Sequence, residues 1–197
     1  MLTPAEAAVV AGVSVRDINR VFDEPILPER FVMSKGDRRL RSDACAFVSF
    51  YFHTAKRLTS DERVRVISRL AGVENGPRVY KDELLTVNFG PFVKDARTRL
   101  TSLVRAKEAV TRDPGILSGT PVIKGTRVPV RDVAASVRAG LPWARVKSAY
   151  PGLTDELIEA ALLYADAHPE RGRPPRLGEA RPELELISER KAARRRP

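Results

Sequence analysis

The stretch of residues 113–168 constrains the fold most, because its local signals agree with one another at every step. It opens with a turn at 113–115, where a proline fixes φ and a glycine tolerates a positive φ. Two β-branched runs follow at 121–123 and 126–130, separated by the Lys-Gly pair at 124–125. This arrangement predicts a short hairpin.

Three helical patterns complete the stretch. The first covers about 131–139, and Gly140 is well placed to end it in the left-handed conformation. The second lies between two prolines, and the third is capped by Thr154. Short helices this close together must pack on one another to bury their apolar faces. A small helix-turn-helix type domain is therefore predicted for residues 112–168.

These residues resemble the small domain of unknown function four-three-three. Its pattern is an Asp-Pro turn, G-x-P-V-I-x-G-T-R-[VI]-P-V, a helix that ends in glycine, then Y-P-x-L-T and an Ala-rich last helix. The resemblance implies a winged-helix-like fold. In many members it also implies the antitoxin half of a VapBC-like type II toxin-antitoxin pair, whose toxin is a PIN-like ribonuclease. The matching residues are Gly119, Pro121, Val122, Ile123, Gly125, Thr126, Arg127, Val128, Pro129, Val130, Tyr150, Pro151, Leu153, Thr154, Ala161 and Tyr164.

Charge and cysteine content narrow the class of protein. The formal net charge of +10, from 35 Lys and Arg against 25 Asp and Glu, favours a polyanionic partner such as nucleic acid, although an acidic protein pocket attracts a basic chain equally well. The single cysteine, Cys45, excludes an internal disulfide framework and suits a reducing compartment. Neither a secretory signal nor a membrane-spanning run is evident, so we expect a cytoplasmic protein without a membrane partner.

The N-terminal segment has the signals of a helix-turn-helix. The run Thr-Pro-Ala-Glu at 3–6 is a capping box, and the helix that it starts ends at Gly12. Ser14 then caps a second helix. Its polar face carries side chains whose geometry matches guanine and adenine edges in the major groove, although an ordinary helical hairpin with a solvated face is the alternative. The predicted base-reading residues are Arg16, Asn19 and Arg20.

A basic wing candidate follows. Residues 31–33 and 39–41 are predicted to be two short strands around a turn at 34–37. Such a loop typically contacts the phosphate backbone. With this wing, residues 1–75 resemble the winged helix-turn-helix of MerR-like and excisionase-like proteins. The predicted phosphate-binding residues are Lys35, Arg38, Arg39 and Arg41.

Further helices and a strand pair are expected before the central stretch. The helix after position 42 contributes the core of the first domain, with Cys45 as a buried small hydrophobe. A helix capped near Thr59 ends at Gly72. Residues 76–111 are predicted to form a strand pair and a long helix that connects the two domains.

The tail at 169–197 is rich in proline, glycine and arginine, with one short amphipathic segment at 183–191. Three interpretations compete: a segment that folds on a partner protein, an AT-hook-like minor-groove element at 171–174, and a solvated basic tail. The first is favoured by the neighbouring domain. The predicted toxin-binding residues are Arg171, Arg173, Leu184, Leu186, Ile187, Arg190 and Arg194.

No constellation for catalysis or metal binding is evident. The two histidines, His53 and His168, are far apart in sequence and lack metal-ligand spacing. The run at 119–126 has the order Lys-Gly-Thr, whereas a phosphate-binding loop requires Gly-Lys-Thr after a strand. We therefore expect no enzymatic activity, no cofactor and no metal site.

The fold class expected is mainly α with short β hairpins: a winged helix-turn-helix N-terminal domain, a small helix-turn-helix type C-terminal domain and an extended tail. The function expected is that of an antitoxin that neutralises a PIN-like ribonuclease toxin and binds operator DNA, as a homodimer or a toxin-antitoxin hetero-oligomer. The main alternative is a stand-alone transcription regulator without a toxin partner. A third possibility is that the N-terminal unit serves dimerisation and does not read DNA.

Overall fold

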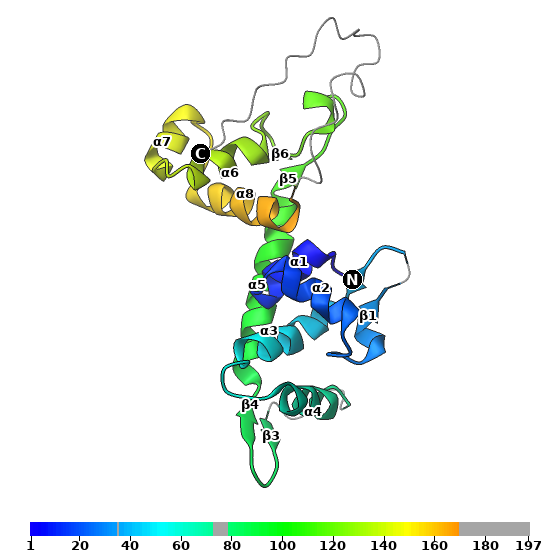
Figure 1. The fold of residues 1–197 in the computed structure, drawn as a ribbon. Coiled ribbons are helices and arrows are strands. Elements are labelled where there is room, and N and C mark those ends of the chain that lie inside the picture. The colour runs from blue at the N-terminus through cyan, green and yellow to red at the C-terminus, as the bar shows by residue number, and fades with distance from the viewer. Residues whose placement is uncertain (35, 73–78, 170–197) are drawn as a thin grey trace, which may run out of the picture.

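The computed structural model describes residues 1–34, 36–72 and 79–169 of the 197-residue chain. These residues form a mainly helical fold with eight α-helices and three short, two-stranded antiparallel sheets (Figure 1). The predicted fold class is confirmed at this level. No helix within the described ranges is both long and apolar enough to cross a bilayer.

The predicted helix-turn-helix begins the chain. Helices α1 (Pro4–Ala11) and α2 (Val15–Asp23) each start with a complete capping box, at Thr3 and at Ser14. Gly12 joins them with φ of 68°, a left-handed conformation in which an L side chain is strained. Both helix starts and the turn agree with the prediction, because all three are set by residues within four positions of one another.

The short hairpin predicted after the helix-turn-helix is present beside α2. Strands β1 (Val32–Met33) and β2 (Arg39–Leu40) pair antiparallel, and Leu2 adds a bridge to Leu40 at the start of the chain. Two hydrogen bonds between the backbones of Leu2 and Leu40, of 2.7 and 3.0 Å, hold this bridge. The hairpin is therefore fixed to the start of α1 and keeps a constant position relative to the helix-turn-helix.

Helix α3 (Cys45–His53) contributes to the first core, as predicted, and Cys45 is fully buried in it. Helix α4 (Ser60–Ala71) follows with a third capping box at Thr59. The next hairpin consists of strands β3 (Val79–Lys81) and β4 (Thr86–Asn88), which project away from the helices (Figure 1).

Helix α5 (Gly90–Glu108) is the long helix around which the described chain is arranged (Figure 1). It packs against α1 and α3 on its first half and against α8 (Asp155–Ala167) on its second. The rings of Phe47 and Phe89 stack with centroids 5.0 Å apart, and Phe50 meets Phe92 edge-on at 5.5 Å. The first core therefore extends from α3 onto the start of α5.

The predicted hairpin between 121–123 and 126–130 forms only in part: the Ile123 amide donates to the Val128 carbonyl and the Val130 amide donates to the Pro121 carbonyl, each at 3.0 Å. Strand β6 (Val122–Ile123) pairs with β5 (Val110–Thr111), which directly follows α5. Of the expected pairing with 126–130 only one bridge exists, from Val122 to Pro129. Proline has no N–H to extend a ladder, and Val130 already begins the next helix, so the second strand does not form.

The last three helices match the predicted helix-turn-helix type core. Helices α6 (Val130–Arg138), α7 (Trp143–Ala149) and α8 surround a second apolar core. Gly140 follows α6 with φ of 84°, as expected for a left-handed helix end. The largest fully buried side chains of this core are Ile123, Val133 and Ile158.

Candidate nucleic-acid interface and the α1–α5–α8 junction

The outward face of α2 carries the predicted base-reading residues. Arg16 and Arg20 are exposed and Asn19 is half-buried, while Ile18 and Val21 of the same helix are buried against the core. The capping box fixes the start of α2, because Ser14 and Asp17 bond reciprocally with each other's backbone amides at 3.2 and 3.1 Å. The sequence therefore places all three polar side chains on the solvent side.

Arg20 is held by a carboxylate of its own helix end. Its Nε and Nη2 donate to the two Glu24 oxygens, each at 2.9 Å, and its guanidinium lies 5.6 Å from the centroid of the Phe52 ring. The hydrogen bond from Arg20 lowers the pKa of Glu24, so the pair stays ionised in neutral solution. Any group that approaches Arg20 therefore meets a guanidinium already paired with Glu24.

The arginines of the hairpin are also paired with acidic neighbours. Arg38 Nη2 donates to Asp23 at 2.9 Å, Arg39 lies 3.4 Å from Asp37, and Arg41 donates to Asp43 at 2.6 Å. Lys35, the fourth predicted phosphate-binding residue, lies outside the described residues. The structure therefore brings Arg38, Arg39 and Arg41 to one exposed hairpin, where each meets a carboxylate.

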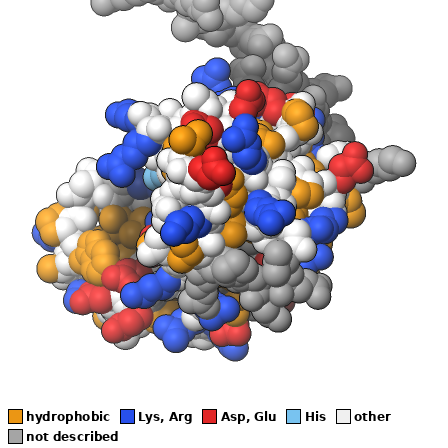
Figure 2. Space-filling view, turned by 90° about the horizontal axis from the view of Figure 1, so that it is seen from below, with side chains coloured by type: hydrophobic (Ala, Val, Ile, Leu, Met, Phe, Trp, Pro, Cys, Tyr) orange, Lys and Arg blue, Asp and Glu red, His pale blue; other side chains and the backbone are white. Residues whose placement is uncertain are grey.

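This mixture of charges extends to other parts of the surface. Figure 2 views the molecule from the β3–β4 end and shows Lys and Arg side chains interleaved with Asp and Glu. Arg16 differs from the other arginines of α2 and the hairpin, because it makes no ion pair with any described residue. Its guanidinium is thus ready for a phosphate or a base without first giving up a partner.

A buried carboxylate joins three helices. Glu6 of α1, 4% exposed, accepts from the Thr3 amide at 2.8 Å and from Lys107 Nζ of α5 at 2.8 Å. His168 Nε2, just after α8, lies 3.5 Å from the same carboxylate. Burial raises the pKa of Glu6, but the hydrogen bonds from Lys107 and Thr3 outweigh it and leave the pKa below its ordinary value.

Sequence reasoning assigned Glu6 only to the capping box and missed its second role. Lys107 lies 101 positions away along the chain, and no local signal marks the contact. The structure thus shows that α1, which begins the helix-turn-helix, is tied by an ion pair to the last turn of α5.

A cleft opens beside this junction, with a volume of about 1140 Å³. Tyr164 forms part of its wall, with its ring stacked on His168 at 4.1 Å and its hydroxyl accepting from Arg112 Nε at 3.3 Å. We call this hollow the α1–α6–α8 cleft. The lining residues are Thr3, Pro4, Ala5, Val15, Arg112, Thr120, Pro121, Val130, Arg131, Asp132, Ala135, Arg138, Tyr164, Ala165, Asp166, Ala167, His168 and Pro169.

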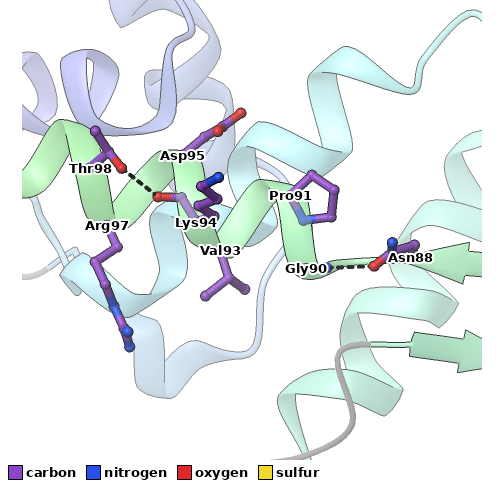
Figure 3. Close-up of a pocket in the computed structure, with 8 residues that line it drawn as sticks. All are labelled: Asn88, Gly90, Pro91, Val93, Lys94, Asp95, Arg97 and Thr98. Atoms are coloured by element: carbon purple, nitrogen blue, oxygen red, sulfur yellow. Dashed lines mark hydrogen bonds between the residues drawn. The ribbon is translucent and has the colours of Figure 1, made fainter.

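A second hollow, of about 600 Å³, lies at the start of α5 (Figure 3). Two of the hydrogen bonds in it are local: Asn88 Oδ1 accepts from the Gly90 amide at 3.0 Å, and Thr98 Oγ1 donates to the Lys94 carbonyl at 3.1 Å. These bonds serve the helix itself, so we assign this hollow no ligand.

The predicted toxin-binding residues cannot be placed by the structure. Arg171, Arg173, Leu184, Leu186, Ile187, Arg190 and Arg194 all lie outside the described residues. Within the described ranges, no group of three or more His, Cys, Asp and Glu side chains is arranged to hold a metal ion.

Comparison with known proteins places the chain in a family. Residues 110–165 match the model of a protein of unknown function, DUF433, which covers β5 through most of α8. The whole chain is 46% identical to the uncharacterized protein y4eO of Sinorhizobium fredii over 208 residues, covering 100% of this chain and 94% of y4eO. No solved structure matches. At that identity over its full length the chain belongs to the same family as y4eO, and residues 110–165 are its DUF433 domain.

Proposed function

We propose that this chain is the antitoxin of a type II toxin-antitoxin pair, which binds operator DNA through α2 and the β1–β2 hairpin and neutralises a PIN-like ribonuclease through residues 170–197. The observation that carries the DNA-binding half is the exposed polar face of α2 beside a basic hairpin, in the order of a winged helix-turn-helix. The toxin-binding half rests on the antitoxin role implied by the DUF433 resemblance and on the tail sequence.

In the DNA complex α2 enters the major groove. Arg16, Asn19 and Arg20 face the bases, and the arginines of the hairpin hold phosphates on one side. Contacts between arginine and phosphate release counterions from the DNA, so the affinity for DNA should fall steeply as the salt concentration rises. A homodimer would place two such units on two half-sites, which is the common arrangement for helix-turn-helix proteins.

Neutralisation of the toxin needs no chemistry from this chain. A metal-dependent nuclease holds its catalytic ions with a cluster of carboxylates. A guanidinium from Arg171, Arg173, Arg190 or Arg194 among those carboxylates would pair with them and obstruct metal or RNA. Leu184, Leu186 and Ile187 would fill a groove on the toxin and anchor the tail.

The toxin-binding half is tested by co-purifying the full chain, and a version that ends at Pro169, with the product of the adjacent gene, followed by a ribonuclease assay of that product. We expect tight binding and inhibition by the full chain, and loss of both in the shorter version. Failure of both versions to bind would remove the toxin from the proposal and leave a stand-alone DNA-binding regulator. Binding by the shorter version as tight as that of the full chain would rule out the tail as the toxin contact.

The DNA-binding half is tested with Arg16→Ala and Arg20→Ala in the full chain, and with Arg97→Ala as control. Arg97 is an exposed arginine of α5 to which we assign no role. We expect each of the first two variants to weaken operator binding by about tenfold, and the control to leave it unchanged. Unchanged binding in all three variants would favour the third possibility, in which the N-terminal unit is a dimerisation module.

A further inference from the structure

We propose that the α1–α6–α8 cleft is the docking site of the acidic and apolar segment 183–189 of the same chain. Docking in this position would hold the segment against both the helix-turn-helix and the DUF433 domain. The inference concerns the free protein and needs neither toxin nor DNA.

The size and lining of the cleft suit a peptide segment. Its volume of about 1140 Å³ exceeds the ~300–1,000 Å³ of ordinary small-molecule pockets. Its wall combines small apolar side chains with arginines, and it joins elements from both ends of the described chain. The apolar part includes Val15, Val130, Ala135 and Ala165.

The charge of the cleft favours an acidic occupant. Arg112, Arg131 and Arg138 line it against two carboxylates, Asp132 and Asp166. Arg112 makes no ion pair with a described residue, and its Nε donates to the Tyr164 hydroxyl, which carries no charge to neutralise it. Arg138 pairs with Asp166 at 2.5 Å, but both side chains are more than half exposed, so this pair can exchange partners at little cost.

One segment outside the described residues complements this lining. Residues 183–189 read Glu-Leu-Glu-Leu-Ile-Ser-Glu, with three carboxylates and three aliphatic side chains. Within 170–197 no other run of seven residues combines three carboxylates with three Leu or Ile side chains, and the end of the chain is Arg-rich. The carboxylates can therefore pair with the cleft arginines while the aliphatic side chains cover its apolar wall.

The position of the tether brings the segment to the cleft. Pro169, the last described residue, is itself part of the lining. Residues 170–182 can span about 45 Å when fully extended, which is ample for a return to the cleft. With a short tether the effective concentration reaches about a millimolar, so a segment that binds with even submillimolar affinity would occupy the cleft for most of the time.

Docking has a consequence that rests on the proposed function. Leu184, Leu186 and Ile187 are the anchors proposed to bind the toxin, and in the cleft they would be covered. A toxin would then have to compete with the cleft for these side chains. The free antitoxin would thereby protect an apolar segment from other partners.

Disulfide trapping in the full chain tests the docking directly. The pair Leu186→Cys with Ala135→Cys places one thiol on the segment and one in the cleft, since Ala135 is exposed there. The control pair is Leu186→Cys with Val104→Cys, because Val104 is 46% exposed on α5 and does not line the cleft. Native Cys45 does not compete, because burial raises the pKa of its thiol to about 12.

We expect the cleft pair to form an internal disulfide at least about tenfold faster than the control pair, seen as a faster-migrating monomer on non-reducing electrophoresis. Reversing the charges of Arg112 and Arg138 with Arg112→Glu and Arg138→Glu should slow it about fivefold, and Glu183→Arg with Glu185→Arg should restore the rate. If the charge-reversed chain does not fold, the trapping rate of the original cleft pair is measured at a salt concentration of about 1 M instead. Screening of the charges should then slow disulfide formation in the same way.

Three outcomes would overturn the docking. Equal trapping rates in the two pairs would show that the segment does not prefer the cleft. A trapping rate that changes neither with the charge reversals at Arg112 and Arg138 nor with salt concentration would show that these arginines do not hold the segment. A disulfide-linked dimer in place of the internal bond would make the occupant the segment of a second copy. None of these outcomes bears on toxin or operator binding, so the proposed function is tested separately.

Discussion

Lys107 Nζ donates to the Glu6 carboxylate at 2.8 Å and so joins the long α5 to the first turn of α1. Glu6 is buried while Lys107 is half exposed. Removing Lys107 would therefore take away the charged hydrogen-bond donor of the buried Glu6 carboxylate. This loss is costly, because a buried carboxylate cannot replace the lost donor with water.

The variant Lys107→Met should lower the free energy of unfolding by about 1–3 kcal/mol, since the loss of one charged partner strands the carboxylate of Glu6. Urea denaturation followed by circular dichroism measures this. Lys94→Met is the matched control, because Lys94 is an exposed lysine of the same helix that forms no ion pair with a described residue. A loss of stability as large in the control would show that charge on α5, and not the contact to Glu6, is responsible.

Acid should remove the contribution of Glu6. Its pKa is lowered in the fold, so its stabilising effect is complete above the unfolded pKa of about 4.3 and is lost as the pH falls through the folded value. The variant Glu6→Gln should therefore be less stable than the native chain at pH 7, and the difference should shrink from about pH 4 downward. Urea denaturation at pH 7, 5, 4 and 3 measures the difference.

Glu62→Gln serves as control for this pH dependence. Glu62 closes an equivalent capping box at Thr59, but it forms no ion pair with a described lysine and is only half-buried, whereas Glu6 is buried. We expect a smaller loss of stability at pH 7 than for Glu6→Gln. An equal loss would assign the effect to helix capping alone and not to the junction of α1, α5 and α8.

The features that could be predicted from the sequence are those set by near neighbours. The capping box at Thr3, the N-caps at Ser14 and near Thr59 and the left-handed Gly140 were all predicted correctly, because each depends on residues within four positions. The β1–β2 hairpin was predicted correctly for the same reason, since a short turn determines which strands pair.

The features that could not be predicted depend on distant residues. Strand β6 pairs with the segment after α5, because the end of that helix carries Val110 and Thr111 to it, and no signal at 121–130 indicates this. The ionic contact of Glu6 is hidden for the same reason. The acidic partners of the wing arginines were visible in the sequence at Asp37 and Asp43, but only the fold shows Asp23 beside Arg38.

Gly140 provides a test of backbone strain without side-chain contacts. Its φ is 84°, and a Cβ built on it meets no atom within 4 Å. Gly140→Ala should therefore cost about 1 kcal/mol from the left-handed conformation alone. Gly152→Ala is the control, because that glycine has an ordinary φ and equally open surroundings, so its stability should be unchanged or slightly raised. Equal thermal stabilities of the two variants would argue against a left-handed end of α6.

The pair of Arg20 with Glu24 predicts a gain of DNA binding by removal of a charge. Glu24→Gln abolishes the carboxylate that holds both guanidinium nitrogens at 2.9 Å, so Arg20 becomes available to DNA and a repelling charge disappears. Operator affinity, measured by fluorescence anisotropy, should rise by about three- to tenfold, with a steeper dependence on salt. Glu29→Gln is the control for net charge, because Glu29 is an exposed carboxylate that forms no ion pair with a described residue. Weaker operator binding by Glu24→Gln would contradict this prediction and would mean that the carboxylate orients Arg20 for the base. In that case the double variant Glu24→Gln with Arg20→Ala would bind the operator no worse than Arg20→Ala alone.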